Sequence, residues 1–167
     1  PATSVQDAGR FGAQRYGLTT SGAMDRVALA MANILAGNPP LAAAIEIGPF
    51  GAAFTARHGA VRVALSGAGR AADIAGAPLA PNQSALVAEG ETLTIGPARD
   101  GVFSYLALEG GISGEPVFGS LSVNARAGLG SPFPRPLQAG DALDTATAHV
   151  LPHERALAAR EPADAVI

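Results

Sequence analysis

The stretch SALVAEGETLTIGPARDGVFSYLALEG, residues 84–110, decides the fold class. Apolar and polar side chains alternate along it, so that Leu93 and Ile95 fall on one face of a predicted strand and Thr92 and Thr94 fall on the other. Gly, Pro and Asp interrupt the stretch, which is typical of short strands joined by tight turns. The stretch therefore predicts a mainly β fold.

Similar short runs precede this stretch at intervals of about ten residues: AAIEIG, GAAFTA, VRVALSG and ADIAG. Such regularity favours a closed barrel or a sandwich, and the periodicity alone does not separate the two. The region 116–136 has no sustained period and contains several prolines. We interpret it as a long ordered loop, and loops of that length in compact domains are usually functional or mobile.

One helix is predicted over residues 23–36. Its apolar stripe consists of positions that recur at helical spacing: Met24, Val27, Ala28, Met31, Ile34 and Leu35. Ser21 is placed to cap this helix, and Asp25 in the first turn complements the helix dipole. The sequence GNPP at 37–40 ends it, because Gly suits the left-handed position and proline cannot continue a helix.

The length of 167 residues is that of one domain, which we place at 1–148. Residues 149–167 are polar and rich in alanine, and we expect a linker or a peripheral helix there. The net charge of −3 argues against nucleic-acid and anionic-membrane partners. The chain has no Cys and no run of about 18 apolar residues. We therefore expect a soluble, cytoplasmic protein.

Several common functional motifs receive little support. SGAGR, residues 66–70, lacks the full phosphate-loop fingerprint and precedes a strand, so we interpret it as a tight β-turn. His149 and His153 have the spacing of a metal pair, but Pro152 lies between them and no third ligand is evident, so no metal site is predicted. Ser21 lacks the context of a catalytic serine. Because all 11 basic residues are Arg, a P-loop lysine and a Schiff base are excluded.

Two polar clusters remain. The first lies at residues 6–26 and the second in the long loop, where Gly residues permit a close approach of the backbone to a ligand. Each cluster contains Arg, which suits a carboxylate, carboxamide or phosphate group. Each is also compatible with ordinary surface charges. The candidate residues are Gln6, Asp7, Arg10, Ser21, Asp25 and Arg26 in the first cluster, and Ser120, Ser122, Asn124 and Arg126 in the second.

A family resemblance adds to this interpretation. The segments VQDAGR, SGAMDR, LAGNP, AAAIEI, LSGAG, YLALEGGI, PVFGS and RAGLG follow one another over residues 5–143. In this order they resemble the biotin-dependent carboxyltransferase family, which includes allophanate hydrolase subunit 2, the C subunit of 5-oxoprolinase and the kinase-inhibitor antagonist KipA. The resemblance covers the N-terminal half of the family's domain.

The resemblance implies a cyclophilin-like β-barrel with the helix packed beside it. It also implies three activities: ATP-dependent opening of 5-oxoproline to glutamate, carboxyl transfer from carboxybiotin to a urea-like amide, or non-enzymatic binding of a KipI-like inhibitor. We favour the first, in a bacterial complex with a KipI-like B subunit and a third subunit. ATP would then be used by the complex and not bound by this chain. Biotin would sit on another chain, since this one has no Lys.

Both chemistries place negative charge on the oxygen of an amide or lactam, so donors aimed at that oxygen are expected. We assign catalytic roles to Asp7, Arg10, Asp25 and Arg26, with an Asp orienting an Arg or accepting a proton. The substrate-binding residues expected are Gln6, Ser21, Ser120, Asn124 and Arg126.

Overall fold

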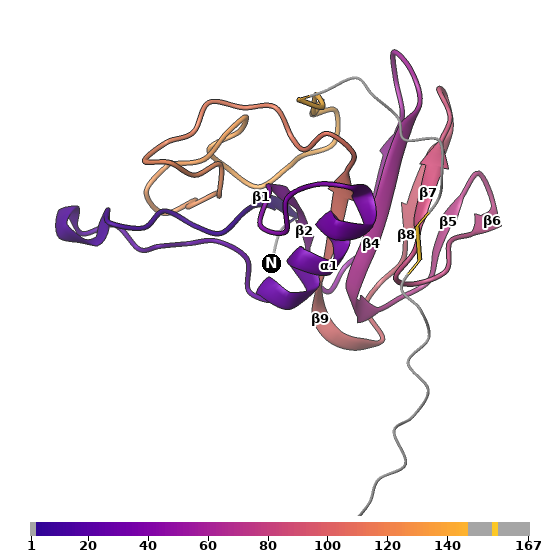
Figure 1. Ribbon diagram of the computed structural model, residues 1–167, viewed down its shortest axis with the longest axis horizontal. Helices are drawn as coiled ribbons and strands as arrows, with labels where there is room; N and C mark the ends of the chain where they lie inside the picture. Colours follow the sequence, from indigo (N-terminus) through magenta and orange to yellow (C-terminus); the bar gives the residue numbers. More distant parts are fainter. Residues whose placement is uncertain (1–2, 147–154, 157–167) are drawn as a thin grey trace, which may run out of the picture.

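The computed structural model describes residues 3–146 and 155–156. These residues form two antiparallel sheets and one α-helix (Figure 1), which confirms the mainly β class. The first sheet has the order β1-β2-β9-β4-β7, with β1 (Ser4–Gln6), β2 (Ala44–Ile47), β9 (Asp100–Leu108), β4 (Val61–Gly69) and β7 (Ser84–Val87). The second has the order β3-β8-β5-β6, with β3 (Ala52–Thr55), β8 (Thr92–Ile95), β5 (Ala72–Ile74) and β6 (Ala77–Pro78).

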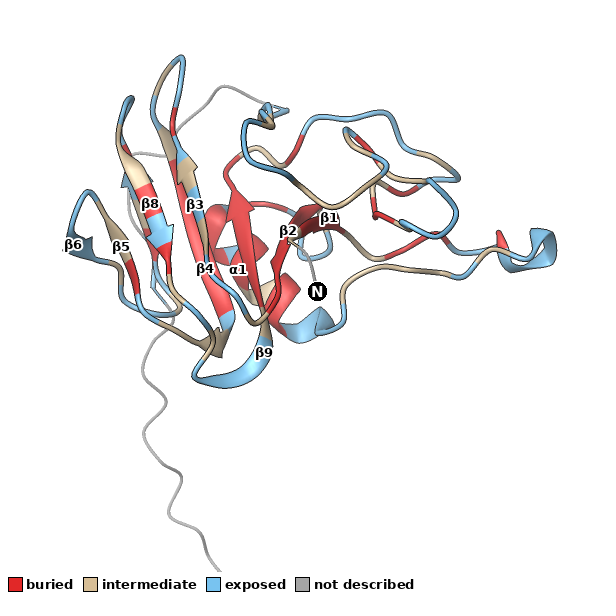
Figure 2. Cartoon of the chain, turned by 180° about the vertical axis from the view of Figure 1, so that it is seen from behind, coloured by how far each residue is buried: buried red, intermediate tan, exposed pale blue. Residues whose placement is uncertain are grey.

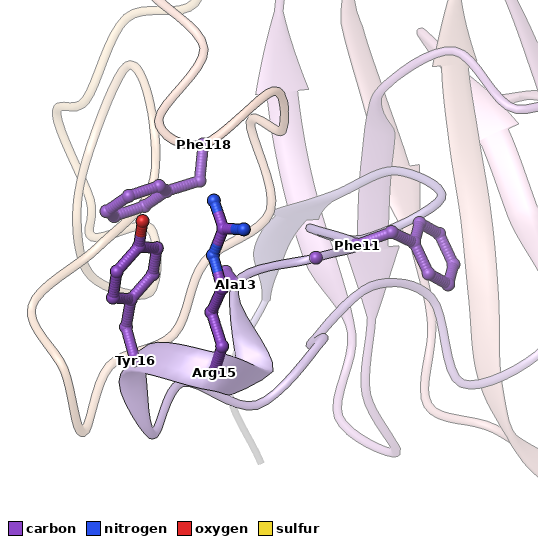
Figure 3. Close-up of a pocket in the computed structure, with 6 residues that line it drawn as sticks. Phe11, Ala13, Arg15, Tyr16 and Phe118 are labelled. Atoms are coloured by element: carbon purple, nitrogen blue, oxygen red, sulfur yellow. The ribbon is translucent and has the colours of Figure 1, made fainter.

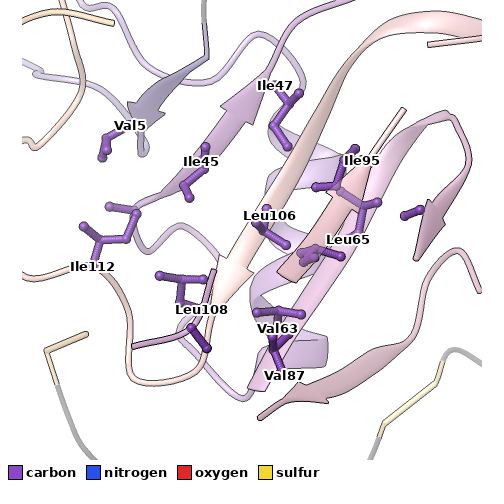
Figure 4. Packing of buried hydrophobic residues seen from close by; sticks show 14 residues of the cluster. Val5, Ile45, Ile47, Val63, Leu65, Val87, Ile95, Leu106, Leu108 and Ile112 are labelled. Carbon is purple, nitrogen blue, oxygen red and sulfur yellow. The ribbon is translucent and has the colours of Figure 1, made fainter. Parts of the chain in front are cut away.

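The first sheet is the middle layer of the molecule, because both of its faces are buried. On β9, Leu106 belongs to a core shared with the second sheet, whereas Tyr105 and Ala107 pack against the helix. Figure 4 shows the first of these clusters, with side chains from both sheets. Leu93 and Ile95 are each 1% exposed in it, so the alternation predicted for β8 is confirmed.

The helix α1 (Arg26–Ala36) begins later than predicted, and Ser21 does not cap it. Asp25 is the N-cap, because its Oδ1 accepts hydrogen bonds from the backbone N–H groups of Val27 (3.0 Å) and Ala28 (2.9 Å). Ser21 has a φ of 54° and cannot begin a helix in that conformation. The helix ends at Gly37 in the left-handed region, as predicted.

The buried face of α1 differs from the predicted stripe. Met24 and Val27 are 71% and 70% exposed, and the buried positions of the helix are Ala28, Leu29, Ala32, Asn33, Leu35 and Ala36. The reason is close packing: the sheet face beneath the helix presents Ala44, Ala64 and Ala107. Small residues on both sides let the helix approach the sheet, and Leu29, Leu35 and Tyr105 fill the rest of this interface.

The closed barrel implied by the resemblance does not form among the described residues. The two sheets share no ladder, and each keeps two edge strands, β1 and β7 in the first and β3 and β6 in the second. Residues 149–167 lie mostly outside the described part. Within that range Arg155 and Ala156 are described, and Ala156 forms an antiparallel bridge with Gln83.

Two irregular segments lie beside the layered body. Residues 8–24, which we call the arm, project away from the sheets and return to α1, with a short 3₁₀ helix η1 (Gln14–Tyr16) at the tip (Figure 1). The predicted loop 116–136 contains no helix or strand, only isolated bridges. Within the described part of the chain, no helix has the length and apolar character needed to cross a membrane.

Candidate functional site

Asp7 joins the base of the arm to the long loop. Its Oδ1 accepts hydrogen bonds from Ser120 Oγ (2.7 Å), Ser122 Oγ (2.6 Å) and the N–H of Gly9 (2.7 Å), and its Oδ2 accepts one from the N–H of Leu121 (2.7 Å). Burial alone would raise the pKa of Asp7. The hydrogen bonds from Ser122, Ser120 and the two N–H groups outweigh burial and hold this pKa below its ordinary value of 3.8. Asp7 is therefore a carboxylate at neutral pH.

Arg10 makes a second link between the same segments. Its side chain is completely buried, and it donates to the carbonyl oxygens of Ser122 and Val117, the latter at 3.4 Å. Burial lowers the pKa of Arg10, and the charge of Asp7 opposes that shift. Among the described residues its Nη1 has no hydrogen-bond partner. We call Asp7, Arg10, Ser120 and Ser122 the Asp7 cluster.

Two more predicted residues tie the first polar cluster to the second. Gln6 Nε2 donates to the carbonyl of Val123 at 3.2 Å, and Asn124 Nδ2 donates to Thr19 Oγ1 of the arm at 3.0 Å. Ser120 and Asp7 are 113 residues apart in the sequence. The structure thus brings the two polar clusters together, which single-sequence reasoning did not anticipate.

Ser21, Asp25 and Arg26 lie outside the Asp7 cluster. Ser21 lies on the returning limb of the arm, and Asp25 caps α1. Arg26 donates from Nη2 to the carbonyl of Ala8 at 2.8 Å, and its guanidinium lies 5.4 Å from the ring centre of Phe11. Arg126 is exposed in the loop. Arg26 therefore links the outgoing limb of the arm to the start of α1.

Sequence reasoning missed a buried pair beneath the start of α1. Tyr105 donates its hydroxyl to Glu46 Oε2 at 2.6 Å, and the backbone N–H of Asp25 donates to the same hydroxyl at 2.7 Å. Glu46 Oε2 also accepts from the N–H of Met24 at 2.9 Å. Burial, and then the neighbouring Glu46 carboxylate, raise the pKa of Tyr105. The available signal was an acidic residue inside the apolar run AAIEIG.

The segment SGAGR is not the predicted turn, because Ser66 to Gly69 continue β4. The pairing of β4 with β9 shifts register between Gly67 and Gly69, which bends the strand end. Arg70 then donates to the carbonyls of Gly96 (3.2 Å), Gly48 (3.1 Å) and Val102 (3.2 Å). This segment therefore connects elements of both sheets.

A cavity of about 460 Å³ lies beside this bend and the start of α1. Its lining includes the predicted residue Asp25 together with Asp100. Among the described residues, no group of three or more His, Cys, Asp or Glu side chains could hold a metal ion. His149 and His153 lie outside the described residues.

A comparison with known protein families identifies the family of this chain. Residues 16–166 match the carboxyltransferase domain, subdomain A and B. The chain belongs to this family. The match includes the returning limb of the arm, α1 and the long loop with Ser120 and Ser122, whereas Asp7 and Arg10 precede its first residue.

Relatives within this family include two bacterial proteins. The chain is 35% identical over 155 residues to the C subunit of 5-oxoprolinase from Haemophilus influenzae, covering 93% of this chain and 50% of that protein. It is 37% identical over 141 residues to the C subunit of 5-oxoprolinase from Escherichia coli, covering 84% of this chain and 45% of that protein. The chain thus spans about half the length of these relatives.

A solved structure extends the likeness to a second kind of enzyme. The Kluyveromyces lactis urea carboxylase superposes on this carboxyltransferase-family chain with a TM-score of 0.83 and 33% identity. The superposition covers 87% of this chain and 13% of that one. The fold and the sequence therefore agree on the family.

Proposed function

We propose that this chain forms part of the C subunit of a bacterial 5-oxoprolinase-type complex, which opens the lactam ring of 5-oxoproline to glutamate with consumption of ATP. The observation that carries the proposal is the identity of 35–37% to two 5-oxoprolinase C subunits over most of this chain. The partners would be the A and B subunits, and the complex would act in the cytoplasm. ATP would be bound by those partners.

The geometry supports a division of labour among the predicted site residues. Gln6, Asp7, Arg10 and Ser120 are largely engaged with protein groups. In this proposal they hold the arm against the loop. Asp7 is a poor general base, because its hydrogen bonds favour the carboxylate over the acid.

The residues that would face the substrate are the more exposed ones. Arg26 and Arg126 are exposed, and Ser21 and Asn124 are partly exposed. When the lactam carbonyl is attacked or phosphorylated, its oxygen gains negative charge, and guanidinium or amide donors aimed at that oxygen lower the barrier. Asp25 would orient Arg26 or accept a proton. This proposal keeps the sequence-based roles of Ser21, Asp25, Arg26, Asn124 and Arg126. It replaces the catalytic roles expected for Asp7 and Arg10, and the substrate-binding roles expected for Gln6 and Ser120, with structural ones.

An assay of 5-oxoproline hydrolysis tests the proposal. The protein that carries this sequence is mixed with the A and B subunits and ATP, and glutamate and ADP are measured. We expect both products only when all three components are present. Arg26→Ala and Arg126→Ala should each lower kcat/KM by about 100-fold or more, whereas Arg57→Ala, an exposed arginine between β3 and β4, should leave it unchanged. Full activity without this protein would refute the proposal.

The likeness to a urea carboxylase favours a second candidate, carboxyl transfer from carboxybiotin to a urea-like amide. Because the chain has no Lys, a biotinylated carrier would have to be another chain. Consumption of urea that requires a biotinylated partner, with no turnover of 5-oxoproline, would support this candidate over the first. Binding of a KipI-like protein without any turnover would indicate a regulator instead.

A further inference from the structure

The tip of the arm and the adjoining loop expose aromatic side chains at one place. Tyr16 and Phe118 are 62% and 53% exposed, and their ring centres lie 6.1 Å apart. Arg15 lies over the Tyr16 ring at 4.9 Å. Figure 3 shows Phe118 near the Tyr16 hydroxyl with the Arg15 guanidinium beside them, while Phe11 points to another side of the arm. We call Arg15, Tyr16 and Phe118, with Phe11 at the margin, the arm surface.

The arm surface has a concave shape. It bounds a cavity of about 300 Å³ whose lining also includes Gly12 and Ala13. Ala13 is 2% exposed, although both of its flanking segments are exposed. Figure 2 shows the tip of the arm as exposed and remote from the buried sheets. Exposed aromatic and arginine side chains around a shallow hollow are the composition of protein interfaces, where Tyr, Phe and Arg are enriched.

The charge of this region is opposite to that of the whole chain. Residues 8–24 and the loop 116–136 contain no Asp or Glu but four Arg (Arg10, Arg15, Arg126 and Arg135), whereas the chain carries 14 acidic residues against 11 basic ones. Arg10 is buried, Arg135 pairs with Asp141, and Arg126 is assigned to the substrate above, so Arg15 supplies the exposed charge of the arm surface. A complementary surface would therefore present carboxylates around an apolar centre.

The arm is also held in one shape before any partner arrives. The N–H of Arg10 donates to the carbonyl of Thr20 at 2.8 Å, and the N–H of Ala23 donates to the carbonyl of Asp7 at 3.0 Å, so the two limbs are hydrogen-bonded to each other. Gly9 and Gly22 face each other so closely that a Cβ atom on Gly22 would lie 2.9 Å from Gly9 Cα. A projecting segment fixed in this way loses little conformational entropy on binding.

From these features we propose that the arm surface is the docking site for a partner subunit of the complex, whose matching patch has an apolar centre and an acidic rim. The choice of a subunit as the occupant rests on the proposed function. The surface itself rests on the exposed rings, the excess of arginine and the rigid support of the arm.

Binding measurements with matched variants test the inference. The protein that carries this sequence is titrated with the purified A subunit and with the purified B subunit from the same organism, by calorimetry or interferometry. Tyr16→Ala combined with Phe118→Ala should raise the Kd for one of these subunits at least about 30-fold, the effect of losing one interface hot spot. Phe50→Ala is the matched control, since Phe50 is 69% exposed in the turn between β2 and β3 and should leave the Kd unchanged.

Charge reversal at Arg15 gives a second measurement, the salt dependence of the association rate, which a misfolded variant would not reproduce. Arg15→Glu should slow association about 10-fold at low ionic strength, and the difference from the wild type should vanish near 0.5 M salt. Far-UV circular dichroism checks that each variant keeps the wild-type fold.

The outcomes separate this inference from the proposed function. If the wild-type protein binds one of the subunits and supports 5-oxoproline hydrolysis, but the double variant binds equally well, the arm surface is not the docking site and the function stands. If the wild type binds neither subunit and supports no hydrolysis, the proposed function fails and the occupant is not a subunit of that complex. A wild-type dimer that the double variant dissociates, or single-stranded oligothymidine bound through Tyr16, would also overturn the inference.

Discussion

Replacing Asp7 with asparagine tests the role of the Asp7 cluster most directly. Asparagine keeps the shape of the side chain but offers one oxygen where the carboxylate offers two. In either orientation of the amide, the N–H of Gly9 or the N–H of Leu121 loses its acceptor. An unsatisfied buried donor costs about 1–3 kcal/mol. Arg10 also loses the negative charge that offsets its burial. The sum should be about 3–5 kcal/mol, because the substitution also leaves the charge of the buried Arg10 uncompensated.

Urea unfolding followed by far-UV circular dichroism measures this loss. With a slope of about 2 kcal/mol per molar urea, the midpoint of Asp7→Asn should fall by about 2 M. The control is Asp73→Asn, because Asp73 accepts one hydrogen bond from the N–H of Gly76 in an exposed turn. That variant should lose less than about 1 kcal/mol. If Asp7→Asn also lost less than about 1 kcal/mol, the carboxylate would not be what holds the arm to the loop.

The pH dependence provides an independent check with a definite sign. The pKa of Asp7 in the folded protein lies below its ordinary value of 3.8, so the carboxylate contributes stability that is fully present above the unfolded pKa. This contribution is lost as the pH falls through the folded pKa, since the wild type then carries a protonated, neutral side chain. The stability difference between the wild type and Asp7→Asn should therefore be largest near pH 7 and shrink progressively below about pH 4. A difference that stays constant down to pH 2 would contradict the charge-based explanation.

Three further predictions concern the arm and the start of α1, each measured by urea or thermal unfolding. Gly22→Ala should destabilise the protein by at least about 2 kcal/mol more than Gly12→Ala. Both residues have a positive φ, so the backbone strain is similar in the two variants. A Cβ atom on Gly22, however, would lie 2.9 Å from backbone atoms, whereas a Cβ atom on Gly12 would have no atom within 4 Å. Asp25→Ala should cost about 1–2 kcal/mol through loss of the cap, and Ser21→Ala, at the position predicted to be the cap, should stay within about 0.5 kcal/mol of the wild type. Tyr105→Phe should cost about 1–3 kcal/mol, because it removes the hydroxyl that links a buried carboxylate to the N–H of Asp25.

The sequence predicted strands better than it predicted packing. Alternation along β8 and β9 identified which side chains share a face, because the period of two is a property of the extended backbone itself. The buried face of α1 was predicted only in part: Ala28 and Leu35 are buried as expected, but Met24 and Val27 are exposed, and the buried Ala32 and Ala36 were not predicted. Which helix residues are buried depends on how closely the helix packs on the sheet. That distance is set by sheet residues far away in the sequence, such as Ala64 and Ala107.

The candidate site also depends on contacts between residues that are far apart in the sequence. Polar residues in glycine-rich segments marked both halves of the Asp7 cluster, but one sequence contains no signal that pairs Asp7 with Ser120. Glu46 was missed because a buried acid inside a strand is indistinguishable from an edge residue until Tyr105 is seen to donate to it. We therefore propose a structural role for Asp7 in place of the catalytic one expected from the sequence. A carboxylate that accepts four hydrogen bonds is a stable anchor and a weak base, so the most distinctive motif of the sequence, VQDAGR, is better suited to shaping the site than to reacting in it.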